Sequence, residues 1–515
     1  MSPIPGPIIL LAVPLIAAAA AYLVRRWALL AALIAAVSAA AIAALCLSLP
    51  LEQSAFVLEQ EVAFGRPVVV LGQTLVLDPA GQLWLAFVFG LAAVYYLIAW
   101  RTPQGRSYFA FNLVMLAMYA LVVLLHTFAL SVLAFAMSAT LAVFIIQAGQ
   151  QASVRGAQRY LLVTLLAVPL LLAAAWFLDQ STLQPEILAE LSPADALAAA
   201  GLADAAFQRA LLLAALGFGL LLAAFPFSTW MPALAADAPP IVSAFLFTAG
   251  QAMAFFLAFR FVQGAPEVLS SPGLSVVVHL AAVAMAISGG VMAAVQRDLG
   301  RMFGYAALSD LGLVLLAFNT GGTRAIDLTL LHLVARSVSI TLLAAAIGIV
   351  QHRAATGQLA ALGGVARRLP VATIALILGA LGLAGFPITA GFPTRWAVSR
   401  AVWNWVQVLA PSSMQSTNPG IPAPAGVEIS GVPGQEWVWI ITLLALVLSS
   451  VGIIVGLIRA LAAMAGTQPR DDIARQPIFA TALLLALIAA AVLVGLRPQI
   501  LVEYVSSAAQ ALGLF

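Results

Sequence analysis

The chain has 515 residues, of which 64% are hydrophobic and only 8% charged. Apolar runs long enough to cross a bilayer recur along it, which predicts an all-α polytopic membrane protein. Its net charge of +3 comes from 22 basic and 19 acidic side chains scattered over many loops. No basic patch exists, so nucleic acid is excluded as a partner. The single cysteine, Cys46, excludes a disulfide framework within the chain, and four scattered histidines argue against a metal site.

Fourteen segments have the apolar length of transmembrane helices. They lie near residues 7–24, 27–49, 80–100, 108–125, 127–147, 160–178, 209–228, 240–262, 274–295, 302–319, 326–350, 370–400, 437–463 and 477–496. All 22 basic residues are arginine, and with the N-terminus outside, most of them fall in inward loops. The outward loops and span ends carry only Arg66, Arg209, Arg260, Arg324 and Arg497. This positive-inside bias predicts that both termini lie outside the membrane.

Proline interrupts two of these segments, at Pro226 in FPFSTWMPALAADAPP and at Pro387 in LAGFPITAGFPTRW. A broken helix survives at membrane depth only where protein or a water-filled cavity receives the freed backbone groups. Spans four to eight and nine to thirteen form two sets of five, with a break in the fourth helix of each set. An odd number of helices per set predicts two inverted repeats, the plan of many transporters.

This plan divides the chain into four parts. We expect an N-terminal three-helix segment at 1–106, the first five-helix repeat at 107–262, the second at 263–463, and a C-terminal helix and tail at 464–515.

Four motifs then resemble a known family. They are FPFSTWMPALAADAPPIVSAFL from residue 225, VQRDLGRMFGYAALSDLGLVLLAF from 295, LHLVARSVSITLLAAAIG from 331 and GGVARRLPVATIALILGALGLAGFPITAGFPTRW from 363. In this order they are similar to the signatures of the proton-conducting antiporter-like membrane subunits of respiratory complex I. The chain's length and its TAGFPTRW sequence favour the N and M types. Related subunits occur in Mrp antiporters and membrane hydrogenases.

The resemblance implies that the chain serves redox-linked proton translocation by an NADH:quinone oxidoreductase-type complex and has no catalytic centre of its own. It implies a location in the bacterial inner (cytoplasmic) membrane, with other membrane-arm subunits and lipids as partners. NADH, FMN, iron–sulfur clusters and quinone are expected in partner subunits, and no cofactor in this chain. The alternative is a proton- or sodium-translocating subunit of an Mrp-type antiporter, membrane hydrogenase or bicarbonate-uptake complex.

The family's conducting residues are largely replaced. The family has a Glu in helix five and lysines in helices seven, eight and twelve, and an intramembrane ionisable group is costly unless it carries function. The family has a further lysine in the helix that contains His332. Here the Glu position is Met137 or Ser138, and the lysine positions of helices seven, eight and twelve are Leu221, Gln251 and Arg395. The lysine position of the His332 helix is Ile340. Only Arg395 is basic, and an arginine stays charged and cannot release a proton.

The remaining polar residues leave alternatives open. Arg395 is either the fixed charge of a residual path or a structural cation paired with a neighbouring subunit. Arg336 is a paired structural ion or a conducting group, and Asp310 is its partner or a proton carrier. His332 either titrates near neutral pH or is a hydrogen-bonded core residue, and Gln251 is read as a neutral packing and hydration residue. The missing charges favour a structural subunit over an ion-translocating one.

Overall fold

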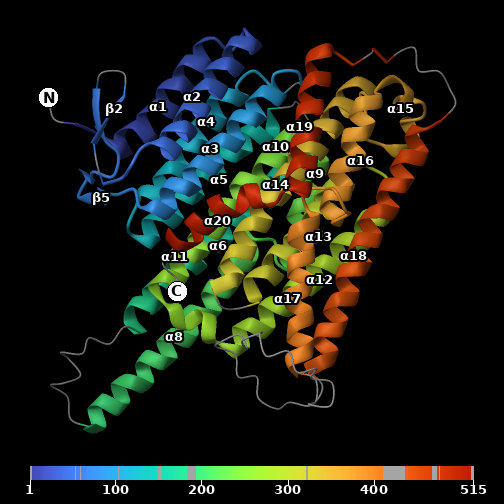
Figure 1. Cartoon of the computed structure of the whole chain (residues 1–515). Coiled ribbons are helices and arrows are strands. Elements are labelled where there is room, and N and C mark those ends of the chain that lie inside the picture. The colour runs from blue at the N-terminus through green and yellow to red at the C-terminus, as the bar shows by residue number, and fades with distance from the viewer. Residues whose placement is uncertain are drawn as a thin grey trace.

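The computed structural model describes residues 3–52, 54–57, 60–102, 104–148, 153–181, 193–320, 323–409, 435–466, 473–474 and 476–511. The described part is nearly all helical, and its long helices run alongside one another in one bundle (Figure 1). Twelve of these helices are long and apolar enough to cross a membrane. The chain is therefore a multi-pass membrane protein.

The N-terminal segment contains three long helices and, between the second and third, most of the β-structure. The helices are α1 (Gly6–Leu23), α2 (Ala28–Ser48) and α3 (Pro79–Ala99). Strands β1 (Ile4–Pro5), β3 (Gln60–Ala63) and β2 (Ser54–Val57) form one sheet, in that order, and β4 (Val68–Val70) pairs with β5 (Gln73–Leu75). Leu71 and Gly72, with φ of 52° and 76°, make the two-residue turn between β4 and β5. The all-α expectation therefore misses two small sheets outside the helical bundle.

The first predicted repeat contains helices that differ in length and regularity. They are α4 (Tyr108–Leu124), α5 (Phe128–Gln147), α6 (Arg155–Ser181), α8 (Pro193–Leu221), the 3₁₀ turn η1 (Phe227–Thr229), α9 (Trp230–Asp237), α10 (Pro240–Phe245), the π-helical turn η2 (Leu246–Gly250) and α11 (Gln251–Gly264). Elements α10, η2 and α11 follow one another without a gap and form one membrane-length helix.

The second predicted repeat and the C-terminal part follow. Their elements are the 3₁₀ turn η3 (Pro266–Ser270), α12 (Pro272–Val295), α13 (Leu299–Asn319), α14 (Thr323–Ala354), the turn η4 (Leu359–Ala361), α15 (Val365–Arg368), α16 (Pro370–Ala384), α17 (Phe392–Leu409), α18 (Gln435–Met464), α19 (Ile478–Leu496) and α20 (Gln499–Ala511). Helix α20 packs against α3 and α14, and the Tyr504 hydroxyl donates a hydrogen bond to the Leu83 carbonyl of α3.

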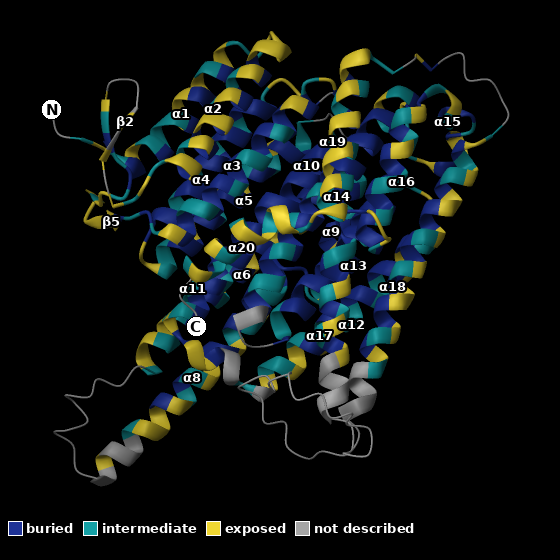
Figure 2. Ribbon diagram, in the orientation of Figure 1, coloured by how far each residue is buried: buried dark blue, intermediate teal, exposed yellow. Residues whose placement is uncertain are grey.

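The core of the bundle lies where the two halves meet. Every residue from Pro240 to Leu257 is buried, as is 89% of an 18-residue stretch of α14, whereas only 17% of such a stretch of α19 is buried. Figure 2 shows this contrast as dark blue in the centre and yellow on the outer helices. A polar side chain on α11, α13 or α14 is therefore removed from the surroundings of the bundle and needs a partner within the protein.

Both expected interruptions are present as breaks between helices. Helix α8 ends at Leu221, and the chain resumes helical structure only in η1 and α9, with Pro226 between them. Helix α16 ends at Ala384, where Gly385 adopts a left-handed conformation with φ of 70°, and α17 begins at Phe392. Pro387 lies in this second gap.

The fourteen predicted spans all overlap helices, but the number of true crossings stays a prediction. The fourth and twelfth spans correspond to α4 and α16, which are shorter apolar helices than the other twelve. The inverted relation between the two sets of five also stays a prediction, as does the division of the chain into four parts.

Candidate functional site

A completely buried arginine lies at the centre of the bundle. The Arg336 guanidinium of α14 donates from Nε to Asp310 Oδ2 of α13 at 2.9 Å. Nη1 donates to the Phe247 carbonyl at 2.8 Å and to Gln251 Oε1 at 2.9 Å, and Nη2 donates to the Ala307 carbonyl at 3.1 Å. A buried charge is tolerated when it is paired and its donors are used, and Arg336 meets both conditions. Its four acceptors come from two neighbouring helices, α13 and the continuous helix of α10, η2 and α11.

The π-helical turn η2 explains how one helix supplies two of these acceptors. Such wide turns are rare and frequently occur at functional sites. Here the turn contains Phe247 and is followed directly by Gln251, and both face the guanidinium. Gln251, expected to be a neutral packing residue, is therefore a hydrogen-bond partner of Arg336. Its Nε2 also lies 3.4 Å from the Met231 sulfur of α9.

Asp310 joins Arg336 to a histidine on the same face of α14. His332 and Arg336 are four residues apart, so they lie one helical turn apart on one side of the helix. The second oxygen of Asp310, Oδ1, is 3.3 Å from His332 Nε2. His332 Nδ1 is 2.7 Å from the Thr394 hydroxyl of α17. The carboxylate thus links a fixed cation to a titratable imidazole.

The Thr394 hydroxyl connects His332 to the second helix break. It lies 2.7 Å from His332 Nδ1 and 3.1 Å from the Gly391 carbonyl. Its single hydrogen serves one of these two groups at a time, so the tautomer of His332 decides which atom donates in the 2.7 Å contact. On the other side of the ring, His332 Nε2 lies 3.3 Å from Asp310 Oδ1 without a well-directed hydrogen bond. The imidazole is therefore held between Thr394 and the Asp310 carboxylate.

Arg395 lies beside this cluster and serves a different group of acceptors. It is next to Thr394 in α17 and only 6% exposed. Its Nη1 donates to the Leu383 carbonyl at 3.1 Å, and its Nη2 donates to the Leu446 carbonyl at 2.9 Å and to the Ser449 hydroxyl. Leu383 is in the last turn of α16, where unpaired carbonyls and the negative end of the helix dipole favour a cation.

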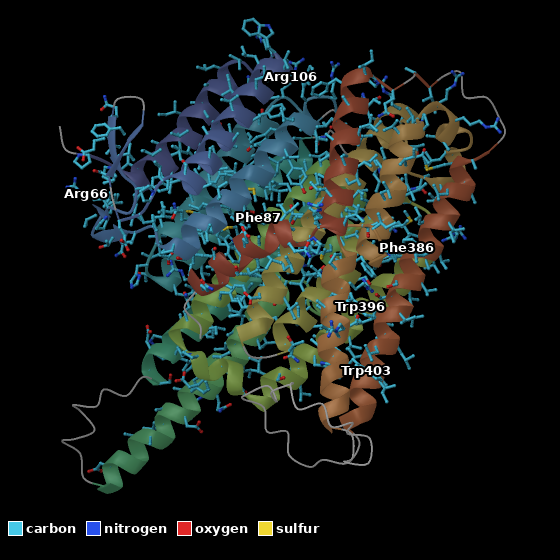
Figure 3. The ribbon with its side chains drawn as sticks, in the orientation of Figure 1. Arg66, Phe87, Arg106, Phe386, Trp396 and Trp403 are labelled. Carbon is cyan, nitrogen blue, oxygen red and sulfur yellow. The ribbon has the colours of Figure 1, made fainter. Side chains whose placement is uncertain are left out.

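The backbone carbonyls at the second break thus accept hydrogen bonds from side chains of neighbouring helices. Arg395 donates to the Leu383 carbonyl, and the Ser450 hydroxyl donates to the Ala384 carbonyl at 2.9 Å. Gly385 leaves room for this arrangement, because a Cβ at that position would be 2.1 Å from Arg395 Cδ. Figure 3 labels Phe386 beside the break and Trp396 on α17, and both are exposed at 49% and 58%. The break therefore has an inner polar side and an outer aromatic side.

A short chain of hydroxyl groups lies near the cluster and has no counterpart in the sequence analysis. The Tyr95 hydroxyl of α3 is 3.0 Å from Thr248 Oγ1 of η2 and accepts from Thr341 Oγ1 of α14 at 2.9 Å. The three hydroxyls connect the N-terminal segment to both predicted repeats. Tyr95 lies in an otherwise ordinary apolar span, so its sequence gives no signal of this role.

The positions expected to hold the family's other charges lack them. Met137 is 56% exposed and points out of the bundle, whereas Ser138 is buried and donates to the Phe135 carbonyl of its own helix at 2.6 Å. Leu221 is buried at the end of α8, and Ile340 is buried in α14. Among the described residues of 107–262, the buried hydrophilic side chains are all uncharged. The charged cluster is therefore built by α13, α14 and α17 of the second repeat.

Comparisons with known proteins identify a family model and a relative that are similar to this chain. A family model described as NADH:quinone oxidoreductase/Mrp antiporter, transmembrane region, matches residues 127–414. NADH-quinone oxidoreductase subunit N of Desulforudis audaxviator is 28% identical over an alignment of 371 residues, which covers 67% of this chain and 70% of that protein.

Two solved structures share the fold over almost the whole length. A chain of respiratory complex I from Thermus thermophilus matches with a TM-score of 0.72 and 18% identity, covering 99% of both chains. A chain of the Mrp complex from Dietzia matches with a TM-score of 0.74 and 18% identity, covering 98% of this chain and 97% of that one.

Proposed function

Because the chain belongs to the family of membrane subunits shared by NADH:quinone oxidoreductases and Mrp antiporters, we propose that it is an antiporter-like subunit in the membrane arm of a respiratory NADH:quinone oxidoreductase-type complex. The extended similarity to a subunit N supports this proposal, since it covers two thirds of both proteins. Such a complex couples electron transfer to proton movement across the bacterial inner membrane. The electron carriers belong to partner subunits, and the arginine distribution supports an outward position for both termini.

We propose that this subunit contributes mainly as a scaffold. A proton relay across the membrane needs titratable groups that follow one another closely, and here the first repeat supplies no buried charge among its described residues. Two of the four ionisable groups at the cluster are arginines, which hold their protons. The observation that carries the proposal is the guanidinium of Arg336, whose hydrogen bonds join α14 to two neighbouring helices, as expected of a structural ion pair rather than a mobile charge.

Arg395 provides the test. Replacing Arg395 with Ala removes the cation from the end of α16, so we expect a lower yield of assembled complex with little loss of pumping per assembled complex. Arg400→Ala is the matched control, because Arg400 is an exposed arginine on the same helix. Proton uptake by reconstituted vesicles is measured and divided by the amount of intact complex. Normal assembly with collapsed normalised pumping would place Arg395 in a working path and overturn the scaffold proposal.

The alternative is an active ion-translocating subunit of an Mrp-type antiporter or related complex. One observation favours it, namely the 3.3 Å contact between His332 Nε2 and Asp310 Oδ1, which places an imidazole beside a carboxylate in the buried cluster. The similarity to the Mrp complex is as high as the similarity to complex I, although at 18% identity it concerns the fold alone. Mass spectrometry of the proteins that purify with the tagged chain distinguishes the two. Co-purifying flavin and iron–sulfur subunits support the first proposal, and antiporter subunits without them support the second.

A further inference from the structure

A large apolar groove lies on the bundle away from the ion-pair cluster. It has a volume of about 610 Å³ and is formed by α8, α11, α12 and α13. Its wall carries several aromatic rings, among them Phe218, Phe255 and Phe318, and no charged side chain lines it. Its rim is open to the surroundings, since Leu212 is 63% and Val277 58% exposed. The groove thus offers an apolar surface that something in the membrane must cover.

The length of the groove matches one leaflet of a bilayer. It extends from Gln208 of α8 to Leu222, one residue past the end of that helix, and 14 residues at about 1.5 Å each correspond to roughly 21 Å. Half of a hydrocarbon core is about 15 Å, and the interfacial region adds several ångströms. Its deep end is formed by Phe225 and Pro226 at the helix break. With the predicted topology, the groove spans the outer leaflet and ends near the middle of the membrane.

The lining and the volume of the groove favour a slender apolar occupant. A volume of 610 Å³ holds about 20 groups of the size of a water molecule or a methylene, at about 30 Å³ each. Because an apolar wall without charges gives water few partners, a single hydrocarbon chain is the better fit.

The outward end of the groove carries a positive charge for a headgroup. Arg209 is exposed and follows Gln208 in α8. It lies three residues before Leu212 and seven before Leu216, both of which line the groove, so helical periodicity places it on the same edge, one turn further out. Its guanidinium lies over the Phe177 ring, with 5.7 Å between Cζ and the ring centroid. An arginine at this level suits a phosphate.

We propose that this groove binds one outer-leaflet phospholipid, with an acyl chain along α8 down to the break at Pro226 and its phosphate at Arg209. The lipid completes the outer surface where α8 and α12 are held apart. This inference rests on the groove alone and holds whichever parent complex contains the chain.

Gly219 allows a direct test of the acyl-chain site. It lines the groove, and a Cβ added there meets only ordinary contacts at 3.8 Å or more, so Gly219→Leu fills the groove without moving the backbone. Leucine also favours the helix over glycine. Ala490→Leu, at an exposed position of α19, is the matched control. A thermal melt of each variant confirms that folding is retained.

The probe is phosphatidylglycerol with a diazirine near the end of one acyl chain, incorporated into nanodiscs that contain the assembled complex. After illumination, labelled peptides are identified by mass spectrometry. We expect the α8 and α12 peptides of the groove to be labelled several-fold more than α19. Gly219→Leu should reduce this labelling at least threefold, whereas Ala490→Leu should leave it unchanged. Equal labelling of groove and α19, or labelling insensitive to Gly219→Leu, overturns the proposal.

Two further measurements separate the phosphate contact and the competing occupant. Arg209→Gln should lower the number of phosphatidylglycerol molecules retained in native mass spectra, and no change overturns the headgroup assignment. A photoreactive amino acid at Leu216 should capture lipid. Capture of a neighbouring subunit instead would show that protein fills the groove and would also overturn the proposal.

Discussion

The buried ion pair gives the sharpest prediction, because its two charges can be removed separately and together. Asp310→Leu leaves Arg336 with three neutral acceptors and no counter-ion. Removing one partner of a buried pair costs about 3–5 kcal/mol, since the other charge stays desolvated. Arg336→Met removes the arginine partner of Asp310 and leaves its contact with His332. We expect a cost of the same size. The Phe247 and Ala307 carbonyls also lose their hydrogen bonds to Arg336.

The double variant should be far less damaging than the sum of the two single ones. Without either charge, the remaining cost is that of the unpaired carbonyls, about 1–3 kcal/mol each. The single variants add to roughly 6–10 kcal/mol, so we expect a favourable coupling of several kcal/mol between the two substitutions. The double variant should be more stable than Arg336→Met, which has the same unpaired carbonyls and a lone buried carboxylate as well.

Thermal unfolding of the purified protein in detergent, followed by tryptophan fluorescence, measures this order. Arg301→Met is the matched control, because Arg301 is an exposed arginine on the helix that carries Asp310, and its replacement should change the melting temperature little. A double variant as unstable as the two single effects added together would refute the reasoning. So would an Asp310→Leu variant that melts like the wild type.

Two other substitutions test the surroundings of the cluster. Tyr95→Phe removes the hydroxyl between the threonines of η2 and α14, and should lower stability by about 0.5–1.5 kcal/mol while leaving normalised pumping unchanged; a large loss of pumping would place the hydroxyl chain in a proton path. Gly385→Ala introduces a Cβ 2.1 Å from Arg395 Cδ at a residue with φ of 70°, and should reduce assembly at a cost above about 1 kcal/mol, whereas Gly363→Ala, which has open space around it, should not. Equal yields of these two glycine variants on a native gel would contradict this account of the break.

Much of the candidate site was within reach of the sequence. A charged residue inside a membrane span is costly, so Asp310, Arg336 and Arg395 stand out in an apolar chain, and Asp310 was already considered as the partner of Arg336. The role of Gln251 was not, because a neutral amide in an apolar helix gives no sign of its partners. Tyr95 and Thr394 were missed for the same reason: hydroxyl groups are common in spans, and their hydrogen bonds depend on helices far apart in the sequence.

Arg395 shows why the tertiary arrangement was needed. Its sequence neighbours suggested either a fixed charge in a path or a cation paired with another subunit. Its described hydrogen bonds within the chain go to carbonyls of α16 and α18 and to a serine hydroxyl. The Leu383 carbonyl is available because α16 ends at Ala384, and which cation reaches it depends on how the two half-helices and α18 pack.

The sequence by itself determined the apolar spans, the positions of both helix breaks and the absence of the Glu and Lys residues that the resemblance implies for proton conduction. These properties are local, since hydropathy and proline act on the segment that contains them. The tertiary structure decided which groups pair with the buried charges and where the apolar groove formed by α8, α11, α12 and α13 opens at the surface. Desolvation requires that a buried charge has a partner, but only the approach of distant helices in space selects that partner.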